Sequence, residues 1–402
     1  MTAYVIDAIR APRGKGREGG GLNSLRPLDI LGQLYGALGD RTGVDPGDVE
    51  EIVLGCVTQT GEQGGNIAQT SALHAGWGVR GSAFTVNSFC TSGLTACADV
   101  AAKIMAGVGD LYVAGGVECM SRVPMASDNG PLTTDREVMR TAPFIPNPII
   151  ADAIAAMEGF TRQDIDAYAV ASHQKAAAAT AQGRFVRSII AIHGADGAVL
   201  LDRDEAIRPD ASTEAMAGLK PLNDPERSAR FLDRMRQDVP HLGDVAHIHH
   251  AGAAPAMVDG AALTLLASEE GARRLGRGVR ARIRAWASTR GPAVLGLTGA
   301  IEAAQTALRR AGLTAADIDL WEANEGFAGV MLKVQRDLGI PPEKMNVNGG
   351  GIAMGHAMGA TGVNLLGAIV DELERRDQTL GLIAISGAAG IGGALIVERC
   401  AL

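Results

Sequence analysis

Two stretches of the sequence decide the fold because they share one pattern: residues 85–107 (TVNSFCTSGLTACADVAAKIMAG) and residues 346–370 (NVNGGGIAMGHAMGATGVNLLGAIV). Each begins as a short strand, passes through a turn of glycine or other small residues, and continues into a helix rich in alanine or small apolar residues. The two turns carry Cys90 and His356, which lie 266 residues apart. Self-similarity at a fixed spacing indicates a repeated structural unit, so this pair predicts a duplicated chain.

The sequence on either side of these stretches repeats as well. Residues 43–53 (GVDPGDVEEIV) match residues 312–321 (GLTAADIDLW) at an offset of 269, each after an amphipathic helix and before a short apolar strand. Each unit then closes with an apolar strand, at residues 111–116 and 380–386. Strands this apolar indicate sheets that are covered on both faces. We therefore predict an α/β fold of two layered halves, with two sheets and helices packed against them.

A region between the two halves takes no part in the repeat. We predict an N-terminal half from residues 1–119 and 245–268, an inserted loop domain from residues 120–244, and a C-terminal half from residues 269–402. Long insertions in compact domains are commonly functional. The loop domain is therefore expected to cap a site on the duplicated core.

Composition excludes several classes of function. The chain has 402 residues and a net charge of −8, which gives no long-range attraction for nucleic acid or an anionic membrane. No apolar run approaches the roughly 18 residues that span a bilayer. The five cysteines are an odd number without CxxC spacing, which favours a reducing cytoplasm and argues against disulfides and zinc. We expect a cytoplasmic protein that interacts with neither nucleic acid nor a membrane.

Two further tracts receive structural interpretations. The tract from His247 to His250 (HIHH) has no carboxylate or cysteine at ligand spacing, so we predict no metal site there. His247 and His249 alternate along the chain and should share one face. Residues 220–236 carry five basic against three acidic residues, which is typical of a solvated helix face.

Cys90 is the candidate nucleophile. It follows a strand and precedes a helix that should begin near Ser92, where the helix dipole favours a thiolate. A small buried hydrophobe is the alternative interpretation of a free cysteine. Because the repeat sets His356 at the matching turn, the two side chains are expected to meet in one cleft as an activated thiol pair.

Two other segments are candidate parts of the site. Asn324 and Glu325 follow an apolar strand at a position where the first half has Gly55 and Cys56, so polarity appears where the repeat is broken. An exposed loop would also explain them. Residues 386–393 (SGAAGIGG) offer backbone N–H groups that suit an oxyanion, although a tight turn has the same composition.

These motifs together resemble the thiolase family over essentially the whole chain. The segment NSFCTSG around Cys90 resembles the family's nucleophile motif, and NEGFA at residues 324–328 resembles its NEAFA box. Residues 350–362 (GGIAMGHAMGATG) resemble its GHP histidine segment. Residues 257–262 (MVDGAA) and 394–399 (ALIVER) also match. The resemblance implies the thiolase fold and a homodimer or homotetramer.

The resemblance also implies a role for each matching residue. Cys90 would take the acyl group from an acyl-CoA, with His356 as its base. Asn324 would hold a water that, together with His356, binds the thioester oxygen of the second acyl-CoA. The backbone N–H groups of Cys90 and Ala388 would bind the oxygen of the Cys90 thioester. Coenzyme A would be a substrate held by the inserted region, and no cofactor would be permanently bound.

Three departures from the family pattern bear on activity. The cysteine of the terminal CxGGGxG motif, which moves the proton at the substrate α-carbon, is replaced by Ser386. A serine hydroxyl is several pKa units less acidic than a thiol near 8.5. Gly326 replaces the alanine of NEAFA, and Ala357 replaces the proline of GHP. Ala253 and Pro255 replace the Asn and Ser of a segment that touches CoA in the family.

The sequence thus predicts a thiolase-type acyl-CoA C-acyltransferase, which cleaves 3-ketoacyl-CoA with CoA or runs the reverse Claisen condensation through an acyl-Cys90 intermediate. The alternative is a thiolase-fold acyltransferase or decarboxylative condensing enzyme that has lost thiolysis because of Ser386. A binding or scaffolding protein on the same fold is the third hypothesis. Chain-length preference and the physiological direction stay open.

Overall fold

Strand pairing divides the molecule into two equivalent halves. The computed structural model describes residues 1–78, 81–142 and 144–400. The strands of the N-terminal half lie in the order β4-β3-β5-β8-β1, and those of the C-terminal half in the order β10-β11-β12-β9. The N-terminal half has two parallel pairs, β4-β3 and β3-β5, and the C-terminal half has one, β10-β11. In each half two antiparallel pairs follow, in β5-β8-β1 and β11-β12-β9. The predicted duplication is confirmed.

The bounds of these strands follow the predicted pattern closely. In the first half they are β1 (Tyr4–Arg10), β3 (Glu51–Gly55), β4 (Ala83–Val86), β5 (Leu111–Cys119) and β8 (Val258–Ala267). In the second half they are β9 (Ala281–Arg290), β10 (Leu320–Ala323), β11 (Leu380–Ser386) and β12 (Ile391–Arg399). The first closing strand thus runs three residues beyond the predicted Gly116.

The two halves share hydrogen bonds, whereas the sequence predicted two separate sheets. β1 pairs with β9 at Tyr4↔Arg282 and Val5↔Ala281, and β2 (Gly14–Lys15) pairs with β8. Ten described strands therefore form one continuous sheet. β1 and β9 are the last strands of their half-sheets, and pairing satisfies backbone groups that each edge would leave free.

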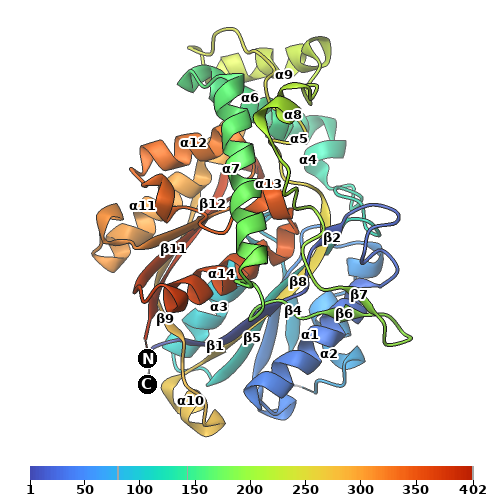
Figure 1. The fold of residues 1–402 in the computed structure, drawn as a ribbon, viewed down its shortest axis with the longest axis vertical. Coiled ribbons are helices and arrows are strands. Elements are labelled where there is room, and N and C mark those ends of the chain that lie inside the picture. Colours follow the sequence, from blue (N-terminus) through green and yellow to red (C-terminus); the bar gives the residue numbers. More distant parts are fainter. Residues whose placement is uncertain (79–80, 143, 401–402) are drawn as a thin grey trace.

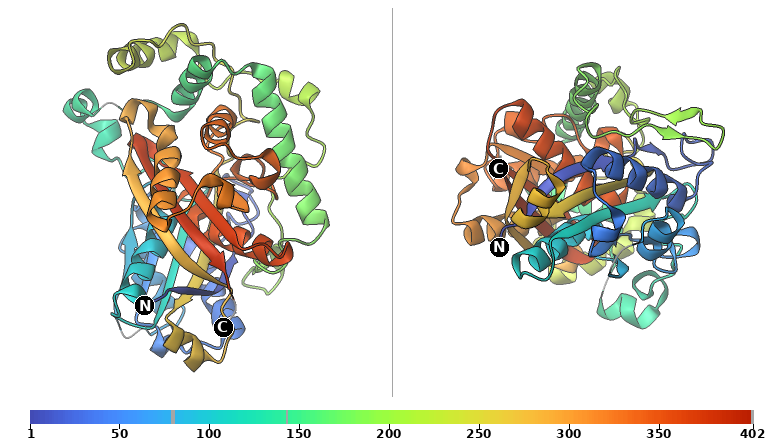
Figure 2. Two further views of the ribbon diagram at one scale, coloured as in Figure 1. Left: turned by 90° about the vertical axis from the view of Figure 1, so that its left-hand side faces the viewer. Right: turned by 90° about the horizontal axis from the view of Figure 1, so that it is seen from below.

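Helices cover the sheet in layers (Figure 1, Figure 2). α3 (Ser92–Met105) and α14 (Thr361–Arg375) pack on each other and on strands of both halves, so they lie between the half-sheets. The outer faces are covered by α1 (Pro27–Thr42) and α2 (Ile67–His74) on one half and by α11 (Gly299–Ala311) on the other, with α12 (Ala328–Asp337) beside it. One face of α3 is buried in this position, at Leu94, Cys97, Ala101 and Ile104.

Glycines allow the His356 turn and α14 to approach β3, β5 and α3 with backbone against backbone. A Cβ on Gly116 would lie 2.0 Å from the carbonyl oxygen of Gly359, and one on Gly362 would lie 2.1 Å from the backbone nitrogen of Leu94. A Cβ on Gly359 would in turn lie 2.5 Å from the carbonyl oxygen of Gly55. No side chain fits at these contacts, so glycine sets the distance between the two halves.

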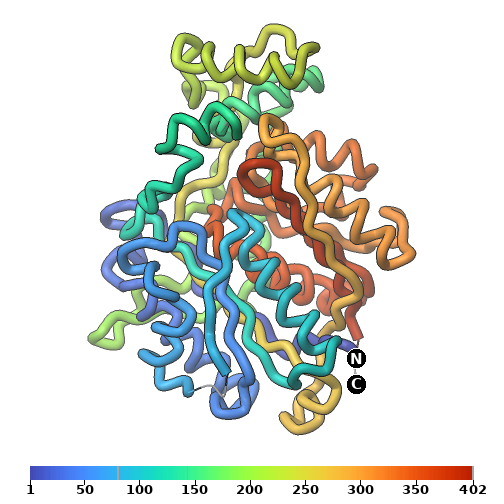
Figure 3. The backbone as a smooth tube through the Cα atoms, turned by 180° about the vertical axis from the view of Figure 1, so that it is seen from behind, coloured from blue at the N-terminus to red at the C-terminus, as the bar shows by residue number. Residues whose placement is uncertain are grey.

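Much of the region between the halves forms a mainly helical cap at the top of the view in Figure 1 and again in Figure 3, while its residues 192–201 lie lower in Figure 1, beside α1. Its elements are α4 (Pro131–Thr134), α5 (Arg136–Thr141), α6 (Asn147–Glu158), α7 (Arg162–Ala181), β6 (Ile192–His193), β7 (Val199–Leu201), α8 (Thr213–Ala217) and α9 (Pro225–Asp238). β8 returns the chain to the sheet between β1 and β5. The domain boundaries at residues 119, 244 and 268 stay a prediction.

The HIHH tract fastens this cap to the core. The buried Asp152 of α6 accepts hydrogen bonds from His247 (2.9 Å) and His249 (2.8 Å), which confirms that the two imidazoles share one face. His249 Nε2 accepts a hydrogen bond from the backbone N–H of Gly329 at 3.1 Å. Among the described residues no group of His, Cys, Asp and Glu has the arrangement of a metal site. No described helix is long and apolar enough to cross a membrane.

The close approach of the turns predicts a large effect of one methyl group. Gly362→Ala is expected to lower the free energy of unfolding by about 3 kcal/mol or more, because its Cβ meets backbone atoms that cannot rotate away. Gly36→Ala, in the exposed middle of α1 with open space around its Cβ, should instead raise it by about 0.5–1 kcal/mol. Urea denaturation followed by circular dichroism measures both, and equal midpoints for the two variants would contradict this account.

Candidate active site

Cys90 sits on a turn that the backbone holds in an unusual conformation. Phe89, just before it, has φ +52°, which costs a bulky residue about 1–3 kcal/mol and is found mainly at functional sites. Ser92, the first residue of α3, accepts a hydrogen bond from the backbone N–H of Ser88 at 2.9 Å and donates one to the Phe89 carbonyl. The predicted start of this helix is confirmed, and its first turn holds Cys90 in a fixed orientation.

A central cavity of about 190 Å³ brings four of the predicted site residues together. Its polar lining includes Cys90, Asn324, His356 and Ser386, which come from four separate turns. The rest of the wall is mainly apolar and includes Met120, Pro255, Leu297, Phe327 and Met358. Ala388, the fifth predicted residue, lines a neighbouring cavity together with Cys90.

The Cys90 thiol is uncharged at rest, so the predicted thiolate is wrong. Burial, together with the nearby Glu118 carboxylate, raises the pKa of Cys90 to about 12, while hydrogen bonds from the backbone of Cys90 and Ala388 lower it in part. Loss of water around the sulfur thus outweighs the helix dipole. The Ala388 contact brings the backbone of the 386–393 turn to the sulfur, where an acyl oxygen would lie after Cys90 is acylated.

His356 is uncharged as well. Burial, with a smaller contribution from the charge of Arg13, lowers the pKa of His356 to about 4. Its Nδ1 is 2.7 Å from Thr361 Oγ1, which fixes the ring, and its Nε2 is buried without a hydrogen-bond partner among the described residues. A neutral imidazole with a free nitrogen in the same cavity as Cys90 is the form that can take a proton from the thiol.

Asn324 lines the central cavity, whereas Glu325 holds the loop that carries Asn324 in place. Asn324 follows β10, bonds through its backbone N–H to the Ala384 carbonyl at 2.9 Å, and lines the central cavity. Glu325 is buried and accepts hydrogen bonds from the hydroxyl of Ser172 (2.7 Å) and the backbone N–H of Ile352 (3.0 Å). Glu325 therefore ties the loop that carries Asn324 to helix α7 and to the short helix α13 (Gly351–Met354).

Ser386 is held by the end of a helix. Its Oγ accepts a hydrogen bond from the backbone N–H of Ala300 at 3.0 Å, in the first turn of α11. The hydroxyl hydrogen remains available to a molecule in the central cavity. Because the N-terminus of a helix favours negative charge, this contact lowers the cost of charge on the Ser386 oxygen as its proton leaves.

Arg13 is a residue near the site that the sequence analysis missed. It is buried after β1, its backbone N–H bonds to Asp204 at 2.9 Å, and its Nη1 reaches the carbonyl oxygen of Gly355 at 3.4 Å. Its Nε is buried without a hydrogen-bond partner among the described residues. Burial is the main reason why the pKa of Arg13 falls to about 10. No motif marks Arg13, and it approaches His356 only through the fold.

An apolar cavity of about 320 Å³ lies on the other side of Cys90. It shares Cys90, Met125, Asn147 and Met358 with the central cavity. Its remaining wall is formed by the turns at Val57, Asn87 and Ala388 and by residues of the cap, among them Leu132 and Phe144. This cavity can take an apolar chain attached to Cys90.

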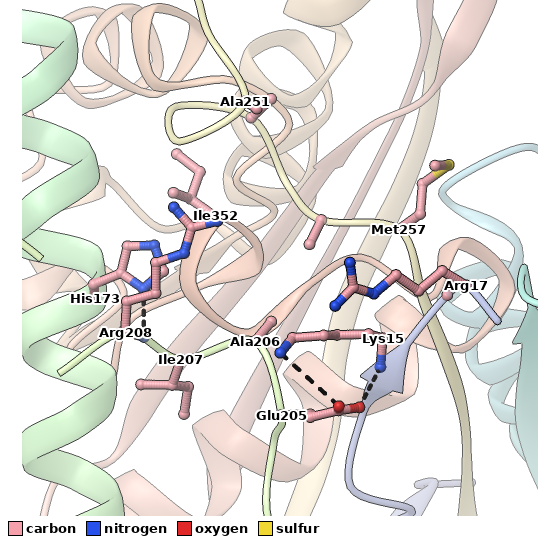
Figure 4. A pocket seen from close by; sticks show the side chains of 13 residues that line it. Lys15, Arg17, His173, Glu205, Ala206, Ile207, Arg208, Ala251, Met257 and Ile352 are labelled. Carbon is pink, nitrogen blue, oxygen red and sulfur yellow. Dashed lines mark hydrogen bonds and ion pairs between the residues drawn. The ribbon is translucent and has the colours of Figure 1, made fainter. Parts of the chain in front are cut away.

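A cationic cleft of about 390 Å³ opens on the opposite side (Figure 4). It shares Ala254, Ala256 and Met257 with the central cavity. Lys15, Arg17 and Arg208 line it along with His173 and one carboxylate, Glu205. The cationic cleft, the central cavity and the apolar cavity therefore adjoin in that order. Cys90 lies where the central and apolar cavities meet.

Ala253 and Pro255 differ in position. Ala253 is fully buried, and its carbonyl accepts a hydrogen bond from the backbone N–H of Ala328 at 3.1 Å. Pro255 lines the central cavity. Neither side chain can donate a hydrogen bond to a ligand.

Fold and site together define an α/β enzyme whose duplicated halves each contribute one turn to a cysteine–histidine pair. Residues 3–270 match the family described as "Thiolase, N-terminal domain", and residues 278–399 match "Thiolase, C-terminal domain". The chain belongs to the thiolase family, and it is an acyltransferase.

Individual relatives agree with this assignment. The chain is 40% identical to a protein named 3-ketoacyl-CoA thiolase from Shewanella loihica, over 99% of both chains. It is 38% identical to a 3-ketoacyl-CoA thiolase from Shewanella frigidimarina, again over 99% of both chains. The crystal structure of the Bacillus anthracis acetyl-CoA acetyltransferase superimposes with a TM-score of 0.86 at 30% identity, over 99% of both chains.

The charge on Arg13 predicts a shift in pH dependence. Arg13→Gln removes a positive charge that disfavours the imidazolium, so the pKa of His356 should rise from about 4 toward its ordinary value. Only neutral His356 accepts the thiol proton. As the pH is lowered, the rate of Cys90 alkylation by iodoacetamide should therefore begin to fall at a higher pH in the variant than in the wild type. Arg13→Lys keeps the charge and should resemble the wild type. An unchanged acid limb in Arg13→Gln would contradict this role, provided circular dichroism shows the fold intact.

Proposed function

We propose that the protein catalyses CoA-dependent thiolysis of 3-ketoacyl-CoA, and the reverse condensation, through an acyl-Cys90 intermediate. The observation that supports this best is that Cys90 and His356 line the same central cavity, while His356 Nε2 has no hydrogen-bond partner among the described residues. Relatives with the name 3-ketoacyl-CoA thiolase cover the chain from end to end. The alternative, an acyltransferase or condensing enzyme that has lost thiolysis, finds no support among these relatives.

The first half of the reaction acylates Cys90. His356 Nε2 takes the thiol proton as the sulfur attacks the 3-keto carbon, and the backbone N–H groups of Cys90 and Ala388 bind the resulting oxyanion. The bond between C2 and C3 then breaks, and its electron pair passes to C2 as an enolate. Asn324, through a bound water, and the protonated His356 stabilise the enolate oxygen. Protonation of C2 releases acetyl-CoA and leaves the shortened acyl group on Cys90.

We propose that Ser386 delivers the proton to C2. An enolate carbon is a far stronger base than an alkoxide, so a hydroxyl is acidic enough to donate to it. The N–H of Ala300 then stabilises the oxygen that has lost its proton. His356 returns a proton to Ser386, which restores both groups for the next step.

The second half of the reaction transfers the acyl group to CoA. His356 takes the thiol proton of CoA, the CoA sulfur attacks the Cys90 thioester, and the same two N–H groups bind the oxyanion. The tetrahedral intermediate then collapses, so that the bond to Cys90 breaks and acyl-CoA leaves. The thiol proton passes back from His356 to Cys90.

The adjoining spaces suit this substrate. The cationic cleft suits the phosphates of CoA, the central cavity suits its thioester end, and the apolar cavity suits the acyl chain that stays on Cys90. CoA and acyl-CoA act as substrates, and the proposed steps require no permanently bound cofactor. We further propose a homodimer or homotetramer in the cytoplasm.

The proposal predicts different effects on the two half-reactions. Cys90→Ala should reduce cleavage of acetoacetyl-CoA by at least about 10³-fold, because it removes the nucleophile. Ser386→Ala should reduce cleavage by roughly 10²–10⁴-fold, the usual contribution of a proton donor, while exchange of labelled CoA into acetyl-CoA persists. Chromatography of the CoA esters measures both reactions. Wild-type protein that exchanges CoA but does not cleave acetoacetyl-CoA would contradict thiolysis.

A second prediction concerns the apolar cavity. Leu132→Trp fills part of it and should lower kcat/KM for 3-ketodecanoyl-CoA at least tenfold, because each methylene in an apolar pocket contributes about 1–3 kcal/mol. Activity on acetoacetyl-CoA, whose acyl group is short, should change less than about twofold. Met139→Trp, on the exposed surface of α5, is the matched control. Equal losses on both substrates would exclude the apolar cavity as the acyl site.

A further inference from the structure

His249 joins the cap to the turn that carries Asn324. The side chain is fully buried, and its Nδ1 lies 2.8 Å from Oδ1 of Asp152 in α6. Its Nε2 accepts a hydrogen bond of 3.1 Å from the backbone N–H of Gly329. Because Nε2 accepts, the ring carries its proton on Nδ1 and donates it to Asp152. The carboxylate therefore fixes the tautomer whose Nε2 can accept a hydrogen bond.

The contact with Gly329 falls at the start of α12. The helix begins at Ala328, and the preceding residue, Phe327, has no side-chain group that can accept a hydrogen bond. The first N–H groups of a helix have no partner within it. Two of them bond instead to the segment before β8, where the Ala253 carbonyl accepts from Ala328 at 3.1 Å. His249 accepts the next N–H group, and thus acts as an N-cap side chain from another part of the chain.

The His249 ring also packs against the wall of the central cavity. It meets the Phe327 ring edge-on, with 5.7 Å between the ring centroids. A Cβ on Gly329 would lie 3.0 Å from Cε1 and Nε2 of the imidazole, so glycine permits this close approach. Phe327 lines the cavity together with Asn324. His249 and Asp152 lie outside this lining, so the imidazole supports the wall from behind.

The turn at residues 324–327 is held at both of its ends. At its start the backbone N–H of Asn324 donates to the Ala384 carbonyl at 2.9 Å. At its end lies the first turn of α12, which Ala253 and His249 hold. The side-chain amide of Asn324 forms no hydrogen bond with another described residue, so the backbone of the turn decides where the amide points. Catalysis is sensitive to a small displacement of such a group.

We propose that His249, held by Asp152, is a positioning residue that fixes the start of α12 and thereby sets the place of Asn324 in the central cavity. This inference rests on the proposed function, in which Asn324 and its water stabilise the enolate oxygen. Acyl transfer uses different donors, the backbone N–H groups of Cys90 and Ala388. His249 should therefore matter more for cleavage of the bond between C2 and C3 than for acyl transfer.

Two reactions of the purified protein separate these steps. Thiolysis of acetoacetyl-CoA passes through the enolate, whereas exchange of labelled CoA into acetyl-CoA requires acyl transfer alone. His249→Leu should lower kcat for thiolysis about 10–100-fold, while KM for CoA and the rate of exchange change less than about threefold. His249→Gln keeps an oxygen that can accept from the N–H of Gly329, so its kcat should exceed that of His249→Leu at least about threefold.

His247→Leu is the matched control. His247 Nδ1 lies 2.9 Å from the other carboxylate oxygen of Asp152, and its side chain is only 6% exposed. It forms no hydrogen bond with any described residue of α12. The variant removes an imidazole from the same carboxylate and leaves the contact with Gly329 in place. Both rates should therefore stay within about twofold of the wild type.

Deuterium uptake gives a readout besides activity. Mass spectrometry of peptides that cover residues 324–332 should show faster uptake in His249→Leu, because the N–H of Gly329 loses its acceptor, and unchanged uptake in His247→Leu. Gly329→Ala disturbs the same contact with the histidine retained, because its methyl group would lie 3.0 Å from the ring. It should give the same selective loss of thiolysis, even where His249→Leu fails to fold.

The results that overturn this inference differ from those that overturn thiolysis. Equal losses of thiolysis and exchange in His249→Leu and Gly329→Ala would contradict a positioning role, because a general weakening of the fold affects both reactions. Unchanged thiolysis in these variants would contradict it as well. If the wild type exchanges CoA but does not cleave acetoacetyl-CoA, the proposed function fails, and deuterium uptake at α12 still decides whether His249 holds the turn.

Discussion

Direct contact between backbone atoms of the two halves sets the geometry on which the rest of the molecule depends. The turn before α14 packs on β3 and β5, and α14 packs on α3, where Gly116, Gly359 and Gly362 leave no room for a Cβ. A side chain at any of these positions would push apart the two helices that lie between the half-sheets. Cys90 lies just before α3 and His356 lies in the turn before α14, so the packing that joins the halves also sets the distance between the proposed nucleophile and its proposed base. Both the stability of the fold and the proposed catalysis therefore require that these positions have no side chain.

Burial, the second consequence of this close packing, decides the charge state of the site. Both Cys90 and His356 lose water on folding, which raises the pKa of the thiol and lowers that of the imidazole. Both shifts favour the neutral forms of Cys90 and His356, so in the proposed reaction an ion pair forms only as the sulfur attacks. The backbone N–H groups of Cys90 and Ala388 can then stabilise charge where it develops. The negative charge of Glu118 raises the pKa of Cys90 further, so Cys90 keeps its proton while no substrate is bound.

The sequence predicted what local patterns encode and missed what arises from long-range placement. The repeat, the start of α3 near Ser92 and the two closing strands follow from periodicity, so they could be recognised in a single chain. The pairing of β1 with β9 depends on how the two halves lie together, which no local pattern records. The charge state of Cys90 was misjudged for the same reason, because a helix dipole is local while desolvation comes from distant segments. Arg13 carries no motif and approaches the His356 turn only through the fold, where its Nη1 reaches the Gly355 carbonyl.

The two halves have similar turns, but the residues at the ends of their closing strands β5 and β11 differ and have different roles. At the end of β5, Glu118 accepts hydrogen bonds from the backbone N–H groups of Val57, Thr58 and Gly359, so a buried carboxylate fastens the two halves together. The corresponding residue at the end of β11 is Gly387, where a Cβ would meet the turn of Cys90 at 3.4 to 3.6 Å. One strand thus ends in a structural anchor. The other ends in a turn of small residues, where Ser386 and Ala388 line the cavities that also contain Cys90. This difference between the halves leaves one such site in the duplicated fold.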